Sequence, residues 1–147
     1  MAENQDSYIQ FDLVSPERKL ISRGVGMVVV PGEEGDFGVL QGHSPIVSTL
    51  RHGVVSVYET RNDKHPSHIF VDGGFADVTA NQCTVLAEHA VKLPDIDQDK
   101  LSEEIKQLHE DLHATTNDDQ ALDKVRRRLD VALAKQSALS LHESGKM

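Results

Sequence analysis

The sequence predicts a β-sandwich followed by a C-terminal hairpin of two antiparallel helices, because its composition changes at Pro94. Before Pro94, four of the five prolines and nine of the ten glycines separate short runs rich in Val, Ile, Thr and Phe, which is typical of strands joined by tight turns. After Pro94 there is no further proline and only Gly145, and apolar residues recur every three or four positions. We therefore expect a β-sandwich domain over residues 1–93 and a helical hairpin over residues 94–147.

Short alternating segments make up the first part of the chain. Ile9, Phe11 and Leu13 alternate with Gln10 and Asp12, so one side of this segment can face a core while the other faces water. Eight short strands at such regular spacing are typical of a sandwich or a flattened barrel. The predicted strands are residues 9–14, 25–30, 37–40, 46–50, 54–59, 68–71, 75–79 and 83–87, with turns at residues 61–63 and 72–74.

Two predicted helices follow, each with a single apolar stripe. Residues 95, 97 and 99 are aspartates, placed where acidic side chains favour the start of a helix, and residues 115–119 interrupt the pattern. Because each stripe is narrow, the hairpin has little apolar surface to bury beyond its own helix contact, so we expect it to be marginally stable. The stripes, at spacings of three and four, are Leu101, Ile105, Leu108 and Leu112, then Leu122, Val125, Leu129 and Leu133.

Composition excludes several classes of protein. The 147 residues suffice for one domain, or for one small domain with an appendage. Fifteen Lys and Arg against twenty-four Asp and Glu give a net charge of −9, which argues against nucleic-acid binding. The longest apolar run covers residues 27–30, whereas a membrane span needs about twenty residues. Residues 1–6 lack the features of a secretory signal, so we expect a cytoplasmic protein.

Catalytic candidates are few. The single Cys83 excludes an internal disulfide, and its place inside a predicted strand indicates a small buried residue. His109, Glu110 and His113 fit the pattern His-Glu-x-x-His, in which two histidines bind zinc and the glutamate acts as general base. A zinc hydrolase also needs a third ligand and a cleft, which an amphipathic hairpin does not supply. We interpret the string as a solvated helix face and keep a small zinc metallohydrolase as the alternative.

A basic run stands out in this acidic chain. Arg126, Arg127 and Arg128, with Lys124 nearby, could hold phosphate or an acidic protein surface. Without interleaved aromatic residues, stacking on nucleotide bases is not supported. A charged helix exterior that pairs with the neighbouring aspartates explains the spacing equally well, so both interpretations stay open.

The glycine-dense segment over residues 32–45 predicts tight loops. It is not a phosphate-binding loop, because no Gly-Lys-Ser/Thr follows and because Glu33, Glu34 and Asp36 would repel phosphate. Acidic side chains on a tight turn fit a contact with basic groups of a partner.

Four strings occur in a distinctive order: FDLVSP at residues 11–16, GDFGVLQGHSP at residues 35–45, GGFADV at residues 73–78 and TVLAEHA at residues 84–90. Together they closely resemble the epsilon subunit of bacterial F-type, proton-translocating ATP synthases. The pattern Gly-x-x-Gly-x-x-x-Gly-His-x-Pro in the second string is the most specific, and the resemblance covers nearly the whole chain. It agrees with the independent prediction of a sandwich and a hairpin.

The resemblance implies a ten-stranded sandwich of two five-stranded sheets, followed by an antiparallel pair of helices. It implies a rotor subunit of the central stalk that has no chemistry or cofactor of its own and links the gamma subunit to the c-ring. Such a chain is peripheral, on the cytoplasmic side of the bacterial inner membrane, and is held there by the complex. The positions that match the gamma and c-ring contact are Asp36 and the Gly42-His43 pair, with Glu33 and Glu34 sharing the acidic loop.

In this family the hairpin can fold against the sandwich or extend along gamma, where it blocks rotation in the direction of hydrolysis. The extended helices would contact the alpha and beta subunits. From its charge, we hypothesise that the cluster Lys124, Arg126, Arg127 and Arg128 then faces acidic loops of the catalytic beta subunits. Narrow apolar stripes suit such a switch, because its two states must differ by only a few kcal/mol.

One family motif is degenerate here. Some family members bind ATP through Ile/Leu-Asp-x-x-Arg-Ala, and this chain has Ile96, Asp97 and Lys100, with Leu101 in place of the alanine. Lysine lacks the planar fork that holds phosphate in a bidentate manner. We therefore predict no tight binding of ATP by the isolated chain.

Overall fold

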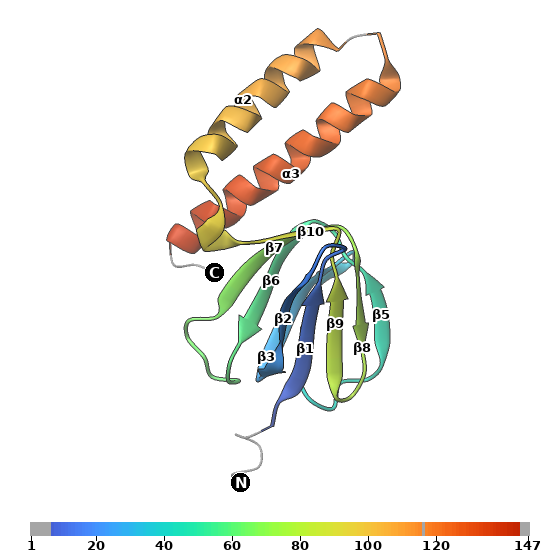
Figure 1. Ribbon diagram of the computed structural model, residues 1–147, viewed down its shortest axis with the longest axis vertical. Coiled ribbons are helices and arrows are strands. Elements are labelled where there is room, and N and C mark those ends of the chain that lie inside the picture. Colours follow the sequence, from blue (N-terminus) through green and yellow to red (C-terminus); the bar gives the residue numbers. More distant parts are fainter. Residues whose placement is uncertain (1–6, 116, 145–147) are drawn as a thin grey trace. The chain divides into compact units, whose positions relative to one another are not determined.

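The computed structural model describes residues 7–115 and 117–144, which form ten strands and two long helices (Figure 1). The chain divides after Lys92 into two compact units, and each is considered by itself. None of the helices in the described ranges is both long and apolar enough to cross a membrane. The strands are β1 (Ile9–Val14), β2 (Lys19–Val25), β3 (Met27–Gly32), β4 (Gly35–Val39), β5 (Ile46–Thr49), β6 (Gly53–Tyr58), β7 (Ser67–Asp72), β8 (Phe75–Val78), β9 (Gln82–Leu86) and β10 (His89–Lys92).

The strands form two five-stranded sheets. Sheet 1 has the order β2-β1-β9-β8-β5 and sheet 2 the order β10-β7-β6-β3-β4; in Figure 1 the strands of sheet 1 lie side by side at the front of the first unit. All pairings are antiparallel except that of β1 with β9, in which Phe11 lies opposite Cys83. The expected ten-stranded sandwich is confirmed, and β4 and β5 are edge strands of their sheets.

Alternation along the strands builds the core between the sheets. In β8, for example, Ala76 and Val78 are buried while Phe75 and Asp77 point outward, because successive side chains of a strand face opposite sides. The cluster is almost entirely aliphatic and excludes water from both inner faces. It consists of Ile9, Phe11, Leu13, Ile21, Val25, Val28, Val30, Val39, Leu50, Val55, Val57, Ile69, Val71, Ala76, Val78, Cys83, Val85 and Ala87.

Two strands were not predicted from the sequence. Strand β2 carries polar or charged residues at several positions and buries only Ile21 and Val25, and β10 has just four residues. The strand predicted over residues 25–30 corresponds to β3 but had the wrong bounds, because β2 ends at Val25 and β3 begins at Met27. Gly26 lies between them, where a Cβ atom would come within 2.6 Å of the Thr60 backbone.

The turn between β7 and β8 requires glycine. Gly73 has φ +71° and Gly74 has φ +109°, a region that other residues rarely occupy. A Cβ atom on Gly74 would also lie 1.9 Å from the carbonyl oxygen of Leu86. The predicted turn at residues 72–74 is therefore confirmed, and its geometry requires glycine at residues 73 and 74.

The second unit begins with a short 3₁₀ turn, η1 (Leu93–Asp95), followed by α2 (Gln98–Ala114) and α3 (Asp119–Glu143). The side chain of Gln98 donates a hydrogen bond to Glu143. Since this bond joins the start of α2 to the end of α3, the helices are antiparallel, as expected (Figure 1).

The apolar stripes of the hairpin differ from the prediction at one position. Leu101, Ile105 and Leu108 are buried along α2, as their spacing predicts. In α3, Leu129 is buried but Leu133 is 36% exposed, and the stripe continues through Ala132 and Leu139. The prediction of Leu133 was wrong because two successive spacings of four residues drift off a face that repeats every 3.6 residues.

Candidate functional site

The acidic turn between β3 and β4 is the first predicted site. Glu33 and Glu34 form the turn and are exposed, and Gly35 follows at φ +144°. Asp36, the second residue of β4, is also exposed. The backbone N–H of Glu33 donates to the Thr49 carbonyl oxygen at 2.9 Å, which ties the turn to the end of β5.

Asp36 forms an ion pair with Arg51 inside this chain. The guanidinium donates through Nη2 to Oδ1 of the carboxylate, and both side chains remain about half exposed. No sequence pattern pointed to Arg51. Arg51 lies just after a strand and near the glycine-rich region, and nothing in the residues around it indicates an ion pair. The pair with Asp36 forms because the strands bring the two residues together, although they are not near neighbours in sequence.

The Gly42-His43 turn lies beyond the opposite end of β4. Gly42 has φ +87°, and its N–H donates to the Ala80 carbonyl oxygen at 2.7 Å. The His43 ring is half-buried, its Nδ1 lies 2.6 Å from the carbonyl oxygen of Ser44, and its centroid is 6.3 Å from that of Phe37. The ring is thereby held near the middle of β4.

These five predicted residues do not converge on one pocket. Glu33 and Glu34 precede β4, Asp36 lies on it, and Gly42 and His43 follow it. Because β4 is the edge strand of sheet 2, the set lines one edge of the sandwich, which we call the β4 edge. Such an edge offers an extended contact for a partner and no enclosed site for a small molecule.

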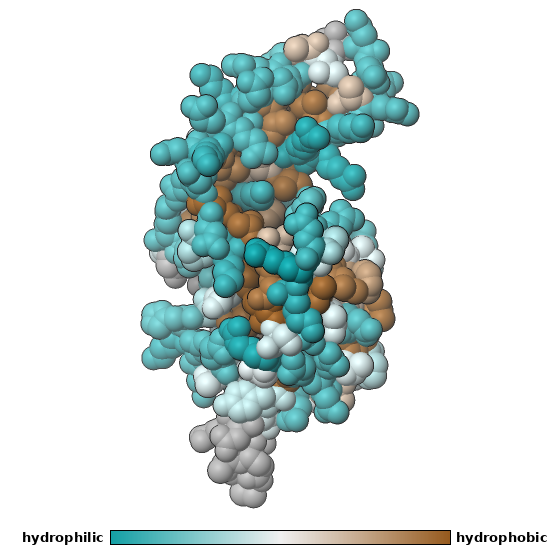
Figure 2. Space-filling view, viewed as in Figure 1, coloured by the Kyte–Doolittle hydropathy of each residue, from teal (hydrophilic) through white to brown (hydrophobic). Residues whose placement is uncertain are grey.

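A second surface was not predicted: the outer face of sheet 1 exposes large apolar side chains. Val47 is 70% exposed, Phe75 42% and Leu86 37%. Phe75 lies opposite both Thr49 and Leu86, and Val47 lies opposite Asp77. Figure 2 shows apolar surface on the part of the sandwich where sheet 1 faces the reader. The alternation in β8 could have revealed this surface, since Phe75 and the buried Ala76 are adjacent and so point to opposite faces of the sheet.

A shallow groove of about 470 Å³ extends this apolar face. It lies beside the β1–β2 turn, and its wall is mostly apolar. Exposed apolar area of this kind on a small domain marks a contact with another protein. The lining residues are Val14, Ser15, Pro16, Gly74, Phe75, Leu86, Ala87 and Glu88.

The same face also holds a buried carboxylate. Asp12 is only 8% exposed and accepts hydrogen bonds from Gln82 at 2.8 Å and Gln10 at 3.4 Å. The Ser22 hydroxyl lowers the pKa of Asp12 most strongly, burial opposes the effect, and the two glutamines add to it. These donors satisfy the charge, so Asp12 is a structural residue of sheet 1.

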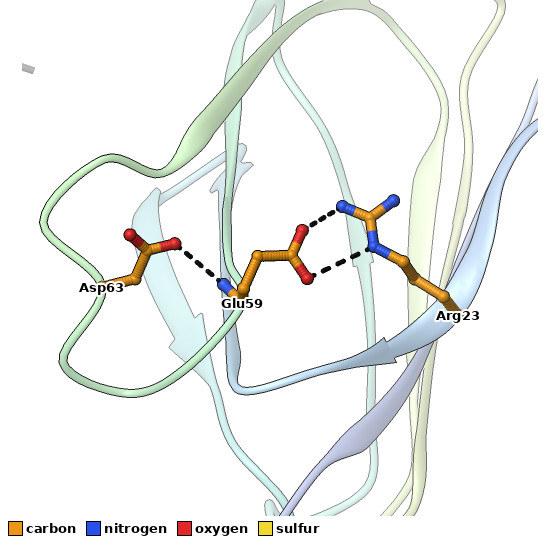
Figure 3. Close-up of polar contacts among 3 residues, drawn as sticks. All are labelled: Arg23, Glu59 and Asp63. Atoms are coloured by element: carbon orange, nitrogen blue, oxygen red, sulfur yellow. Dashed lines mark hydrogen bonds and ion pairs between the residues drawn. The ribbon is translucent and has the colours of Figure 1, made fainter.

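An ion pair links the two sheets at another edge. Arg23 on β2 donates through two nitrogens to the carboxylate of Glu59, which follows β6 (Figure 3). Asp63 accepts hydrogen bonds from the backbone N–H groups of Glu59 at 3.1 Å and His65 at 2.9 Å, and the first of these bonds is drawn in Figure 3. This arrangement fixes the position of the Glu59 side chain.

The basic cluster lies on α3. Lys124, Arg126, Arg127 and Arg128 are all exposed. Within residues 7–115 and 117–144, none of the three arginines forms an ion pair with a neighbouring aspartate. The exposed cluster can meet a partner or solvent, and both interpretations stay predictions.

The degenerate ATP motif lies at the start of α2. The Asp97 side chain caps this helix and accepts hydrogen bonds from the N–H groups of Asp99 at 3.0 Å and Lys100 at 3.1 Å. Ile96 is half-buried and Lys100 is exposed. A polar groove of about 160 Å³ opens between the two helices; Gln98 and Leu101 of the motif line it, whereas Ile96, Asp97 and Lys100 do not.

The zinc-site alternative is not supported. His109, Glu110 and His113 are exposed on α2. In the described part of the chain, no three His, Cys, Asp or Glu side chains gather closely enough to hold a metal ion. Two exposed histidines without a third ligand do not make a catalytic zinc site.

Comparisons with known proteins agree with the geometry. Residues 8–93 match the family described as "ATP synthase, Delta/Epsilon chain, beta-sandwich domain". The "ATP synthase epsilon chain" of Parvibaculum lavamentivorans is 49% identical over 121 residues, which are 80% of this chain and 89% of the relative. That of Maricaulis maris is 46% identical over 112 residues, 76% and 82% of the two chains.

A solved structure shares the fold. A chain in the Euglena gracilis mitochondrial ATP synthase, described as "OSCP/F1/c-ring in rotational state 1", superposes with a TM-score of 0.78 at 22% identity. The match covers 90% of this chain and 82% of that chain. The family match spans the whole sandwich and the bacterial relatives extend into the helices, so this chain belongs to the ATP synthase delta/epsilon chain family.

Proposed function

We propose that this chain is a non-catalytic subunit of the central stalk of a bacterial F-type ATP synthase, linking the gamma subunit to the c-ring. The observation that carries the proposal is the family match over residues 8–93, because that segment forms the sandwich with its two exposed surfaces. The chain then takes part in proton-driven ATP synthesis through mechanical coupling. It is peripheral, on the cytoplasmic side of the inner membrane, and is held there by its partners.

We assign the β4 edge to the c-ring. Glu33, Glu34 and Asp36 present carboxylates, and Gly42 and His43 continue the same edge. Charged and polar groups at such a contact set its register and orientation more than its affinity. A contact that must hold one orientation during rotation is served by this arrangement.

We assign the apolar outer face of sheet 1 to the gamma subunit. Phe75, Leu86 and Val47 provide exposed apolar area, and the groove beside them can receive a side chain of the partner. Apolar and aromatic anchors in a central pocket supply most of the affinity in protein interfaces. This contact would therefore hold the subunit on the stalk.

The sandwich suits the transmission of torque. Its aliphatic core is closely packed, and packed interiors deform little. The pair of Arg23 and Glu59 adds a side-chain link between the sheets. A load applied between the β4 edge and the outer face of sheet 1 would pass through a rigid body.

We propose that the hairpin is a regulatory element that inhibits ATP hydrolysis. The exposed charges of Lys124, Arg126, Arg127 and Arg128 suit acidic loops of the catalytic beta subunits. The hairpin buries few large apolar side chains: Leu101, Ile105 and Leu108 on α2, and Leu129 and Leu139 on α3. An element with so small a core can change its arrangement at modest cost.

The hairpin is proposed to act without tight nucleotide binding. Asp97 already serves as a helix cap, and Lys100 cannot hold a phosphate in a bidentate manner. Titration calorimetry of the isolated chain with Mg-ATP tests this, and a dissociation constant in the micromolar range would overturn it.

The experiment that tests the proposed function compares assembled ATP synthase containing the full chain with a complex whose chain ends after Pro94. The truncated complex should hydrolyse ATP faster and still pump protons. Loss of proton pumping on truncation would instead assign the mechanical linkage to the helices.

A further inference from the structure

We propose that Arg51 is a positioning residue for the c-ring contact: it holds the Asp36 carboxylate in place so that the free oxygen, Oδ2, can accept a hydrogen bond from the partner. This inference rests on the proposed function, because it concerns the β4 edge. Nothing in the sequence pattern of the acidic turn indicates the role, since Arg51 is fifteen positions from Asp36.

The backbone around Arg51 is tied to the end of β3 and to the acidic turn by two hydrogen bonds. The Glu33 N–H donates to the Thr49 carbonyl oxygen at 2.9 Å, and the Arg51 N–H donates to the Pro31 carbonyl oxygen at 3.1 Å. Together these two bonds form the isolated bridge between Gly32 and Leu50. The backbone position of Arg51 is therefore fixed relative to β3 and β4, so that its guanidinium can reach Asp36.

The chain leaves room for this path at Gly53. A Cβ atom there would lie 2.8 Å from Nη1 of Arg51 and 2.9 Å from Cβ of Pro31. In the sheet register Pro31 lies opposite Asp36. Because Gly53 lacks a side chain, the Arg51 guanidinium can pass beside Pro31 and reach the carboxylate of Asp36, which pairs with Pro31 in the sheet.

The pair leaves acceptor capacity on Asp36. The guanidinium uses Oδ1, whereas Oδ2 has no hydrogen bond to any residue in the described ranges. An ionised carboxylate has about four lone-pair sites. Asp36 can thus bind Arg51 and a donor of the c-ring at the same time.

If Arg51 has a competing role and not a positioning role, the expected change in affinity is reversed. If Arg51 only competed with a basic group of the partner, removing it would strengthen the contact. If it positions Asp36, removing it weakens the contact, because the freed carboxylate must lose side-chain entropy on binding. In the wild type, the three carboxylates of Glu33, Glu34 and Asp36 and the Arg51 guanidinium together carry a net charge of −2, whichever role Arg51 has. Whether the Arg51 variant binds more tightly or more weakly than the wild type therefore separates the two roles.

The test measures the dissociation constant of the full chain for a complex of its own gamma subunit and c-ring. We expect Arg51→Gln to bind about fivefold more weakly and Arg51→Lys to lie between it and the wild type. Arg23→Gln is the matched control, since Arg23 and Glu59 are exposed by 43% and 51%, against 44% and 57% for Arg51 and Asp36. The control should bind as the wild type does, and urea unfolding should show similar stability for both variants.

A double variant completes the test. In an Asp36→Asn background, Arg51→Gln should cause no further loss, because the two residues act as one unit. Equal or tighter binding of Arg51→Gln, the same loss in Arg23→Gln, or fully additive effects of the two changes would each overturn the role of Arg51. Failure of the wild-type chain to bind the complex would instead show that the proposed function is wrong, and the role of Arg51 with it.

Discussion

Arg51 forms an ion pair with Asp36, the acidic residue of strand β4 on the β4 edge. The edge therefore presents Glu33 and Glu34 as free carboxylates and Asp36 as part of an ion pair. A partner meets a mixed polar surface there. Association through such a surface would depend on orientation, and in the proposed function the apolar face of sheet 1 would supply affinity separately.

Gly74→Ala should strongly destabilise the sandwich. The φ of +109° disfavours any side chain, and the new Cβ would lie 1.9 Å from the Leu86 carbonyl oxygen. We expect a loss of at least about 2 kcal/mol in the free energy of unfolding, measured by urea titration. Gly38→Ala is the control, because its nearest contact would be Met27 Sδ at 3.9 Å, and it should leave stability unchanged or raise it by up to about 1 kcal/mol. Equal effects of the two changes would contradict the proposed turn geometry.

Cys83 should resist alkylation in the folded chain. Burial, with smaller contributions from Asp12 and Asp77, raises the pKa of the thiol to about 12. At pH 8 roughly one thiol in ten thousand is then ionised, and the nucleophile is the thiolate. Iodoacetamide should label the unfolded chain within minutes and the folded chain at the rate at which the sandwich opens. Rapid labelling under native conditions would show that β9 is not part of the core.

Asp12 should make the sandwich sensitive to acid. Its folded pKa lies below the ordinary 3.8, so the ionised group stabilises the fold above that value, and the contribution is lost as pH falls through the folded pKa. Asp12→Asn should reduce the free energy of unfolding by about 1–3 kcal/mol at pH 7. The difference from the wild type should shrink as pH falls below the ordinary value of 3.8. A difference that stays constant with pH would exclude this role of the charge.

Within the hairpin, Leu129→Ala should cost more stability than Leu133→Ala. Leu129 is 7% exposed and Leu133 36%. We expect about 2–4 kcal/mol for the first change and about 1 kcal/mol or less for the second. Amide hydrogen exchange along α3 measures both in the full chain. Equal losses would support the stripe predicted from sequence, which contains both residues, and not the one in the structure.

Reversing the charges of Arg126, Arg127 and Arg128 should raise ATP hydrolysis by the assembled complex. The exposed cluster is the proposed contact with acidic loops, and like charges across that contact would repel. As a control, reversal of Glu103, Glu104 and Glu110 on α2 alters the same number of exposed charges and should leave hydrolysis unchanged. Unchanged hydrolysis in the arginine variant would remove the proposed role of the cluster.

The predictability of each feature follows the range of the interactions behind it. Alternation and turn chemistry are local, so β1 and the turn at Gly73 and Gly74 were predictable. Strand β2 was not, because it buries only Ile21 and Val25 and owes its place to pairing with β1. The site divides in the same way. The acidic turn was visible in the sequence. The ion pair with Arg51 was not, because it forms only where the chain passes from one sheet to the other.

The most direct test of the central claim is ATP-driven proton pumping by the ATP synthase from which this chain has been removed and to which it is then returned. The account predicts that the depleted complex hydrolyses ATP without pumping and that the full chain restores pumping in proportion to its binding. Undiminished pumping in the depleted complex would contradict the claim that this chain links the gamma subunit to the c-ring.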